Sequence, residues 1–355
     1  MRAMNGRERT LAAMRHELPD RLPVDYICVE NAGAVAQAAG LAPGADVDAF
    51  LGRDGRIIAA GDYTGELPRR PAGQRLSMWG TEDGNDYGTA HHYPLGAADS
   101  VVEVERHPWP DGSQFADFAR QREIARDWRR QYAVRGPYWT SAPLFCTLCN
   151  LMGMEEAMMK MASEPAVAEA CLDQILRFSL TYVEGFLDGC GDALDILYLA
   201  DDFASQRGLL MRPQQWRTLL KPRYAKLFEL GKRRGLPIWF HSCGDITAVL
   251  SDLIDIGLDV WETVQLHALP MPAAELKRRF GRHVTFFGGI NTQRLPFATP
   301  AAVQAEVVEV CRALGPGGGF ICGPDHHLKP DVPPANALAL FAVARGFRQA
   351  GITRD

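Results

Sequence analysis

The sequence lacks the long apolar runs that mark a membrane protein. No stretch approaches the roughly 18–20 apolar residues needed to cross a bilayer, and the longest apolar run, residues 337–344, has the length of a short helix. The first 20 residues carry several arginines but no apolar core of the kind found in signal peptides. We therefore expect a cytoplasmic protein with no membrane partner.

Neither sign of charge predominates in the chain. It has 38 basic and 43 acidic side chains, a formal net charge of −5 over 355 residues, and no basic run longer than residues 232–234. Nucleic-acid binding depends on clustered positive charge, so we expect no nucleic-acid partner. Hydrophobic residues make up 47% of the sequence and charged residues 23%, which is enough apolar surface for a packed core.

Glycine-rich nucleotide-binding motifs are also missing. No G-x-G-x-x-G follows a predicted strand, no P-loop motif is present, and the glycines at 317–319 precede a predicted strand instead of opening a helix. The eight cysteines, in a long chain without a signal peptide, do not indicate a disulfide framework. Cys146 and Cys149 lie in an apolar stretch with no second C-x-x-C, so we expect them to pack inside a helix.

What the chain does contain is a regular alternation of strand-like and helix-like segments. Short β-branched or aromatic runs each end in small or polar residues, and one amphipathic segment separates successive runs. The predicted strands are 195–199, 238–240, 260–264, 284–287 and 319–322, with earlier candidates at 24–29 and 132–134. The predicted helices between or after them are 217–232, 246–256, 271–280, 300–314 and a closing helix in 333–351.

This alternation is typical of βα units that build a parallel sheet. The number and spacing of the strands favour an α/β fold of the (β/α)8 TIM-barrel type over a doubly wound sheet. We expect one domain over residues 1–355. Residues 33–131 are less regular and rich in glycine and proline, and are predicted as a capping insertion of loops and helices at one end of the barrel.

Polar and metal-binding side chains gather where the predicted strands end. In a parallel barrel these ends meet at one edge and carry the reactive groups. The residues at the strand ends are Asp201, Asp202, His241, Cys243, Glu262, Gln265, Asn291, Cys322, Asp325, His326 and His327.

The sharpest of these features is His241-Ser242-Cys243-Gly244. Residues two apart on an extended chain point to the same side, so the imidazole and the thiol are predicted to converge. Nitrogen and sulfur donors together suit Zn²⁺. The third ligand is predicted from the cluster after the last strand. Position at the start of a loop favours His326, whereas thiolate chemistry favours Cys322, and His327 is a further alternative. We predict His326 as the third ligand.

Three protein ligands would leave one coordination position open, as in catalytic zinc sites. Such an ion can deprotonate a bound thiol or act as a Lewis acid on an oxygen, and the sequence does not choose between them. Asp201 and Asp202 follow a strand and are predicted to be catalytic, holding a polar group of the substrate or acting as acid and base. The alternative is a helix N-cap together with a solvated acid.

Several motifs, in order along nearly the whole chain, resemble the uroporphyrinogen decarboxylase-like superfamily, specifically its zinc-dependent methyltransferase branch. The H-x-C-G segment lies in 238–246. The other similar segments are 7–14, 19–23, 201–208, 221–224, 287–294, 317–326 and 331–336.

The resemblance implies a TIM barrel with zinc held by His241, Cys243 and a late residue that falls on His326. It also implies transfer of a methyl group between a methylated small molecule, a corrinoid (cobalamin), often on a carrier protein, and a thiol acceptor. Gln206, Glu262, Gln265 and Asn291 are expected to bind substrate. The methyl donor, the direction of transfer and any oligomerisation are left open.

Two other functions are weighed against this one. The first is a metal-free decarboxylase of a polycarboxylated substrate, which needs several arginines in the pocket. Arg207 and Arg294 are the obvious candidates, and the Arg-rich R-Q-A-G-R-Y segment of the haem-pathway decarboxylases is absent. The second is a barrel that binds a corrinoid or carrier protein without turnover.

Overall fold

The computed structural model describes residues 3–69, 76–82, 92–116, 118–138 and 143–348. Seven parallel strands form one curled sheet in the order β1-β2-β3-β6-β7-β8-β9. Their bounds are β1 Gly55–Ile57, β2 Ala133–Gly136, β3 Ile196–Ala200, β6 Ile238–His241, β7 Leu258–Val264, β8 Thr285–Ile290 and β9 Phe320–Pro324. A separate hairpin pairs β4 (Ala204–Ser205) with β5 (Gly208–Leu209).

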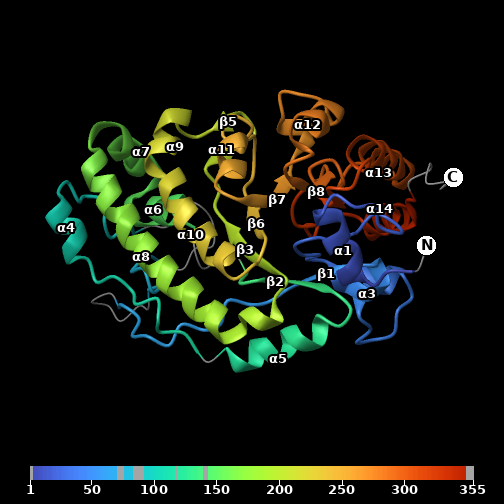
Figure 1. The fold of residues 1–355 in the computed structure, drawn as a ribbon, viewed down its shortest axis with the longest axis horizontal. Helices are drawn as coiled ribbons and strands as arrows, with labels where there is room; N and C mark the ends of the chain where they lie inside the picture. Colours follow the sequence, from blue (N-terminus) through green and yellow to red (C-terminus); the bar gives the residue numbers. More distant parts are fainter. Residues whose placement is uncertain (1–2, 70–75, 83–91, 117, 139–142, 349–355) are drawn as a thin grey trace.

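Helices lie around the outside of the curled sheet, to its left and right in Figure 1. The first half of the chain holds α1 Gly6–Met14, α2 Ala32–Ala38, α3 Val47–Leu51, α4 Val101–Arg106, α5 Ala119–Trp128, α6 Phe145–Met152 and α7 Met154–Ser163. The second half holds α8 Pro165–Cys190, α9 Pro213–Leu219, α10 Lys221–Arg233, α11 Leu250–Asp255, α12 Ala273–Phe280, α13 Pro300–Leu314 and α14 Pro334–Gly346. Short 3-10 helices occupy Gly191–Ala193 and Leu266–Ala268.

The predicted strand at 24–29 is replaced by two isolated bridges, Val24 with Cys322 and Val29 with Leu328. On its other side the Asp54 N–H donates to the carbonyl of Val24, so this segment lies between β9 and β1. The Cys322 N–H donates to Pro23. The next backbone donor from β9 toward the segment 24–29 would be residue 324, which is a proline and has no N–H. The expected eight-stranded barrel is therefore found as a curled sheet of seven strands with a bridged eighth segment.

The predicted alternation of strands and helices is confirmed for the second half of the chain, with small shifts at the ends. One prediction there is wrong: the single helix at 217–232 is two helices, α9 and α10, which meet at Leu220. Pro222 lies in the first turn of α10, and a proline cannot continue a helix from the preceding turn. Strand β1, which the sequence does not predict, lies within the segment 33–131.

Side chains from the strands alternate between two apolar layers. The inner layer, enclosed by the curled sheet, consists of Ile27, Ala133, Ile196, Tyr198, Trp239, Val260, Phe287 and Ile321. The intervening residues, such as Leu197 and Leu199, pack in the larger cluster beneath the helices. This alternation follows from the period of two along a strand. It also places Arg135, Glu262 and His241 on the inner side of the sheet, leading to its carboxyl edge.

In the part of the chain that the structure describes, no helix combines the length and apolar character needed to span a bilayer. Cys146 and Cys149 lie buried in α6, as predicted. All eight cysteines are free thiols.

Candidate metal centre

Three predicted ligands come together at the carboxyl edge of the sheet. His241 is the last residue of β6, Cys243 lies in the loop after it, and His326 follows β9. One ligand atom from each lies within 4.8 Å of the others, and His241 Nε2 is 3.5 Å from Cys243 Sγ. His241 is buried and the other two side chains are half-buried. The site is thus enclosed on the inner side and accessible from the edge of the sheet.

The tight turn after Cys243 depends on Gly244. Its φ of +82° lies in the left-handed region, and a Cβ on this residue would lie 2.4 Å from the carbonyl oxygen of Ser205 in the β4–β5 hairpin. The hairpin packs directly on the loop, because the Asp245 N–H donates to the same carbonyl. Glycine is therefore required for the loop after Cys243 to pack against the hairpin.

Glu262 on the neighbouring strand β7 orients the imidazole of His241. Its Oε1 is 2.9 Å from His241 Nδ1 and also accepts the hydroxyl of Tyr198, while Trp239 Nε1 donates to Oε2. Because Nδ1 is engaged, Nε2 is the ring nitrogen that faces Cys243 and His326. Carboxylates in this position set the tautomer of metal-binding histidines. The structure therefore places Glu262, which we predicted to bind substrate, beneath the ligand and fully buried.

Two other predicted residues support the ligand loop. Asp202 Oδ1 accepts the backbone N–H of Cys243 at 2.7 Å, and Gln265 Oε1 accepts that of Gly244 at 2.8 Å. Asp202 Oδ1 also lies 3.7 Å from His241 Nε2. Asp202 therefore lies at the centre, with its side chain 13% exposed.

Asp201 binds the N-terminus of helix α6 and does not face the metal centre. Its carboxylate accepts the backbone N–H groups of Leu144, Phe145 and Cys146 at 2.6–2.9 Å, at the start of α6. The hydroxyl of Tyr224 donates to it as well, at 2.6 Å. A buried carboxylate with four donors satisfies the free N–H groups of a helix N-terminus. This geometry corresponds to the N-cap alternative.

The remaining candidates lie at the periphery or turn away. Gln206 is exposed at the turn of the β4–β5 hairpin, and the side chain of Asn291 accepts the N–H of Gln293 within its own loop. The sulfur of Cys322 lies 3.6 Å from that of Cys311 on α13, on the outer side of the sheet. His327 pairs with Glu30 at 3.2 Å. Cys322 and His327 are thus both engaged with partners other than the cluster.

The electrostatics of the cluster favour a bound cation. Burial by itself lowers the pKa of His241, but the neighbouring Cys243, Glu262 and Asp202 raise it well above its ordinary value. An environment that stabilises a proton on this ring also stabilises a positive ion beside it. Burial and the adjacent His241 lower the pKa of His326 to about 4, so its ring is neutral at pH 7 and has a lone pair to donate.

The donor set fits Zn²⁺. With Zn–N distances of about 2.0 Å and Zn–S of about 2.3 Å, ligand atoms around one ion lie about 3–4 Å apart. The spacing of 3.5 Å between His241 Nε2 and Cys243 Sγ is in this range, and the three donor atoms all lie within 4.8 Å of one another. Burial and Asp202 raise the pKa of Cys243, so binding of an ion would displace the thiol proton.

Sequence reasoning missed the groups beneath the centre. Tyr198, Trp239 and Arg135 are buried on the inner side of the sheet and surround Glu262. The available signal was a charged residue, Arg135, directly after the predicted strand 132–134. An unpaired charge is strongly unfavourable in a packed barrel interior.

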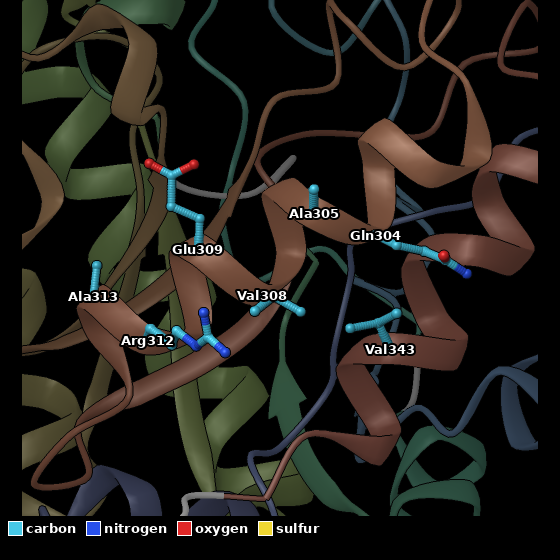
Figure 2. Close-up of a pocket in the computed structure, with 7 residues that line it drawn as sticks. All are labelled: Gln304, Ala305, Val308, Glu309, Arg312, Ala313 and Val343. Carbon is cyan, nitrogen blue, oxygen red and sulfur yellow. The ribbon is translucent and has the colours of Figure 1, made fainter.

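A groove elsewhere on the surface contains none of these residues. It runs between α13 and α14, is lined by Gln304, Val308, Arg312 and Val343 among others, and is drawn in Figure 2.

The fold and the cluster together define an α/β protein with a candidate metal centre at the carboxyl edge of a parallel sheet. A family model described as uroporphyrinogen decarboxylase (URO-D) matches residues 139–347. This match covers well over half of the chain, which therefore belongs to the uroporphyrinogen decarboxylase family. The resemblance expected from the sequence motifs is confirmed.

Relatives of this chain carry two different names. A uroporphyrinogen decarboxylase of Pseudomonas aeruginosa (strain LESB58) is 23% identical over 258 residues, which cover 68% of this chain and 67% of the relative. The methylcobamide:CoM methyltransferase MtaA of Methanosarcina barkeri is 26% identical over 194 residues, covering 54% of this chain and 53% of the relative. A solved methyltransferase from Methanosarcina mazei superposes with a TM-score of 0.63 at 19% identity, over 97% of this chain and 99% of that one, and this likeness concerns the fold.

Proposed function

We propose that this protein is a zinc-dependent methyltransferase that moves a methyl group between a methylated small molecule, a corrinoid and a thiol. The observation that carries the proposal is the convergence of His241, Cys243 and His326, whose donor atoms lie within 4.8 Å of one another. A mixed nitrogen and sulfur donor set at the carboxyl edge of the sheet suits a catalytic zinc ion. The similarity to the methyltransferase MtaA supports the same assignment.

The three ligand side chains would hold the ion, and Zn²⁺ would lower the pKa of a thiol bound to it, making the sulfur nucleophilic. Glu262 fixes His241 with Nε2 toward the site, and Gln265 holds the turn at Gly244. Asp202 accepts the N–H of Cys243 and would be the acid beside the bound substrate. Asp201, in contrast, positions α6. Gln206 and Asn291 lie at the same edge and would contact the substrate or carrier.

The transfer itself would exchange one bond for another at the methyl carbon. In one direction, a thiolate sulfur attacks the methyl group of a methylcorrinoid, the carbon–sulfur bond forms, and the cobalt–carbon bond breaks with both electrons left on cobalt. The thiol proton leaves to solvent before the attack. The corrinoid, on a carrier protein or free, is a co-substrate in this scheme. We further propose that residues 1–355 form one domain.

Decarboxylation is the second candidate, because the family description and several relatives carry that name. It needs cationic groups that pair with substrate carboxylates. The structure places Arg207 and Arg294 at the surface, with the Arg294 side chain 67% exposed. Arg135 is buried and paired with Asp25. These positions favour methyl transfer over decarboxylation.

The first experiment measures metal content and corrinoid chemistry in the same preparations. We expect about one zinc ion per chain in the wild-type protein, and loss of zinc in His241→Ala, Cys243→Ser and His326→Ala. The matched control is His327→Ala, which removes the adjacent imidazole and leaves the cluster intact. Protein without zinc in every preparation would exclude this function.

The second experiment follows the cobalt absorption spectrum. Methylcobalamin is incubated with a panel of thiols, and reduced cobalamin with methoxylated compounds and methylamines. Zinc-dependent demethylation or methylation of cobalt supports the proposal. Release of carbon dioxide from a polycarboxylated substrate, unaffected by a chelator, would support the decarboxylase instead, and binding of cobalamin without turnover would indicate a binding protein.

A further inference from the structure

Beneath the metal centre, buried charges of alternating sign form a row through the interior of the sheet. Arg53 Nε is 2.8 Å from Asp25 Oδ1, and Asp25 Oδ2 is hydrogen-bonded to Arg135 Nη1. Arg135 Nη2 lies 3.8 Å from Glu262 Oε2, and Glu262 Oε1 lies 2.9 Å from His241 Nδ1. The row therefore begins at Arg53 and ends at a predicted metal ligand.

The row is buried along its whole length. Asp25 and Glu262 are fully buried, Arg135 is 1% exposed and Arg53 is 9% exposed. A buried charge is strongly unfavourable unless an opposite charge or hydrogen bonds compensate for it. Each of the two carboxylates faces a guanidinium, and Arg135 faces both carboxylates. Arg135 is thus the residue that connects Glu262 to the rest of the row.

Arg135 and Trp239 together determine how Glu262 is rotated. Trp239 Nε1 donates to Oε2, and Arg135 Nη2 lies 3.8 Å from the same oxygen. The guanidinium of Arg135 also lies 4.3 Å from the centre of the Trp239 ring. Oε1 is left for Tyr198 and His241. Among the described residues, Arg135 Nε and Nη2 have no hydrogen-bond partner, so the attraction to Glu262 is the polar interaction available to that end of the guanidinium.

We propose that Arg135 is a positioning residue of the metal centre. By holding Glu262 with Oε1 toward His241, it keeps Nε2 of the imidazole directed at Cys243 and His326 and increases the affinity of the centre for zinc. This inference rests on the proposed function, since it assumes that the three residues bind a metal ion. The competing explanation is that Arg135 serves only to neutralise Asp25.

The test is a double-mutant cycle read out as Zn²⁺ affinity. The metal-stripped wild-type protein, Arg135→Met, Glu262→Gln and the double variant are titrated with Zn²⁺ against a competing chromogenic chelator. Removal of groups that orient a metal-binding histidine weakens binding by about 10–100-fold, and we expect this loss in both single variants. If Arg135 acts through Glu262, the double variant binds no more weakly than Glu262→Gln alone.

Arg53→Met is the matched control, because it also removes a buried guanidinium from Asp25 but does not approach Glu262. We expect it to lower the unfolding midpoint while the Zn²⁺ affinity stays within about threefold of the wild type. If Arg135→Met does not fold, Arg135→Lys replaces it in the cycle, since lysine keeps a cation near Asp25 but lacks the planar group that stacks on Trp239.

The outcomes separate the two proposals. Wild-type protein that binds no zinc contradicts the proposed function and this inference with it. Wild-type protein that binds zinc, together with an Arg135 variant whose affinity is within threefold of it, contradicts the inference alone. Two results would show that Arg135 acts on the fold and not through Glu262. One is a double variant whose loss of Zn²⁺ affinity is the product of the losses in the two single variants, and the other is a loss in Arg53→Met as large as that in Arg135→Met.

Discussion

Asp202 Oδ1 lies 2.7 Å from the backbone nitrogen of Cys243 and 3.7 Å from Nε2 of His241. One carboxylate oxygen thus contacts both ends of the H-x-C motif. It accepts the N–H that sets the position of the cysteine, and its charge raises the pKa of His241 together with Cys243 and Glu262.

From this contact we predict that Asp202→Ala weakens zinc binding by about tenfold, the lower end of the range for groups that support metal ligands. Asp202→Asn retains an oxygen acceptor for the Cys243 N–H, so we expect it to weaken zinc binding by no more than about twofold. The measurement is a competition titration with a chelator. Equal losses in the two variants would show that the charge, and not the hydrogen bond, is what matters.

Asp201 is expected to act on stability. Replacing it with alanine leaves three backbone N–H groups of the first turn of α6 and the hydroxyl of Tyr224 without their acceptor. Unsatisfied buried donors cost about 1–3 kcal/mol, and we predict a fall of about 2–3 kcal/mol in the free energy of unfolding, measured with urea. Asp127→Ala, at an exposed ion pair with Arg130, is the control and should leave the unfolding midpoint unchanged. An unchanged midpoint in Asp201→Ala would contradict the helix-capping role.

Thiol labelling provides an independent view of the centre. Cys28 and Cys243 are half-buried, and the other six cysteines are buried. We predict that a thiol reagent modifies these two in the native protein and all eight only after unfolding. Bound Zn²⁺ should protect Cys243 and leave Cys28 reactive. The variants Cys28→Ser and Cys243→Ser identify each site, and protection of Cys28 instead of Cys243 would contradict the assignment.

Lys277 should make stability depend on pH. Burial lowers its pKa to about 8 from 10.5, and its ammonium group donates to the carbonyl of Gly318. Between these two values the unfolded chain binds more protons at this residue than the folded chain does, so this group raises stability as pH increases from 8 to 10.5. Below pH 8 the residue is charged in both states, and the cost of burying the charge is fully present.

The check compares the wild type with Lys277→Met, which cannot titrate. We expect the wild-type free energy of unfolding to rise by about 1–3 kcal/mol relative to the variant over this pH interval, with partial exposure reducing the full value. The comparison uses urea unfolding at several pH values. Parallel curves for the two proteins would contradict the lowered pKa.

The sequence by itself determined which segments form strands and helices in the second half of the chain, since periodicity and proline positions are local properties. Helix α13 occupies the predicted residues 300–314 because Thr299 caps it and Pro300 begins it. The H-x-C motif was likewise readable, since two residues apart on an extended chain share a side. Family membership followed from motifs of this kind.

The tertiary structure alone decided the roles of the side chains around the centre. Asp201 and Asp202 are adjacent in sequence but face opposite directions, one toward α6 and the other toward Cys243. Glu262 and His241 are 21 residues apart and meet only because β6 and β7 pair with these residues in register. Contacts between distant segments depend on strand order and register, which local sequence patterns do not encode. For that reason the sequence could name residues of the centre, including Asp202, Glu262 and Gln265, but not that these three hold the ligands in place.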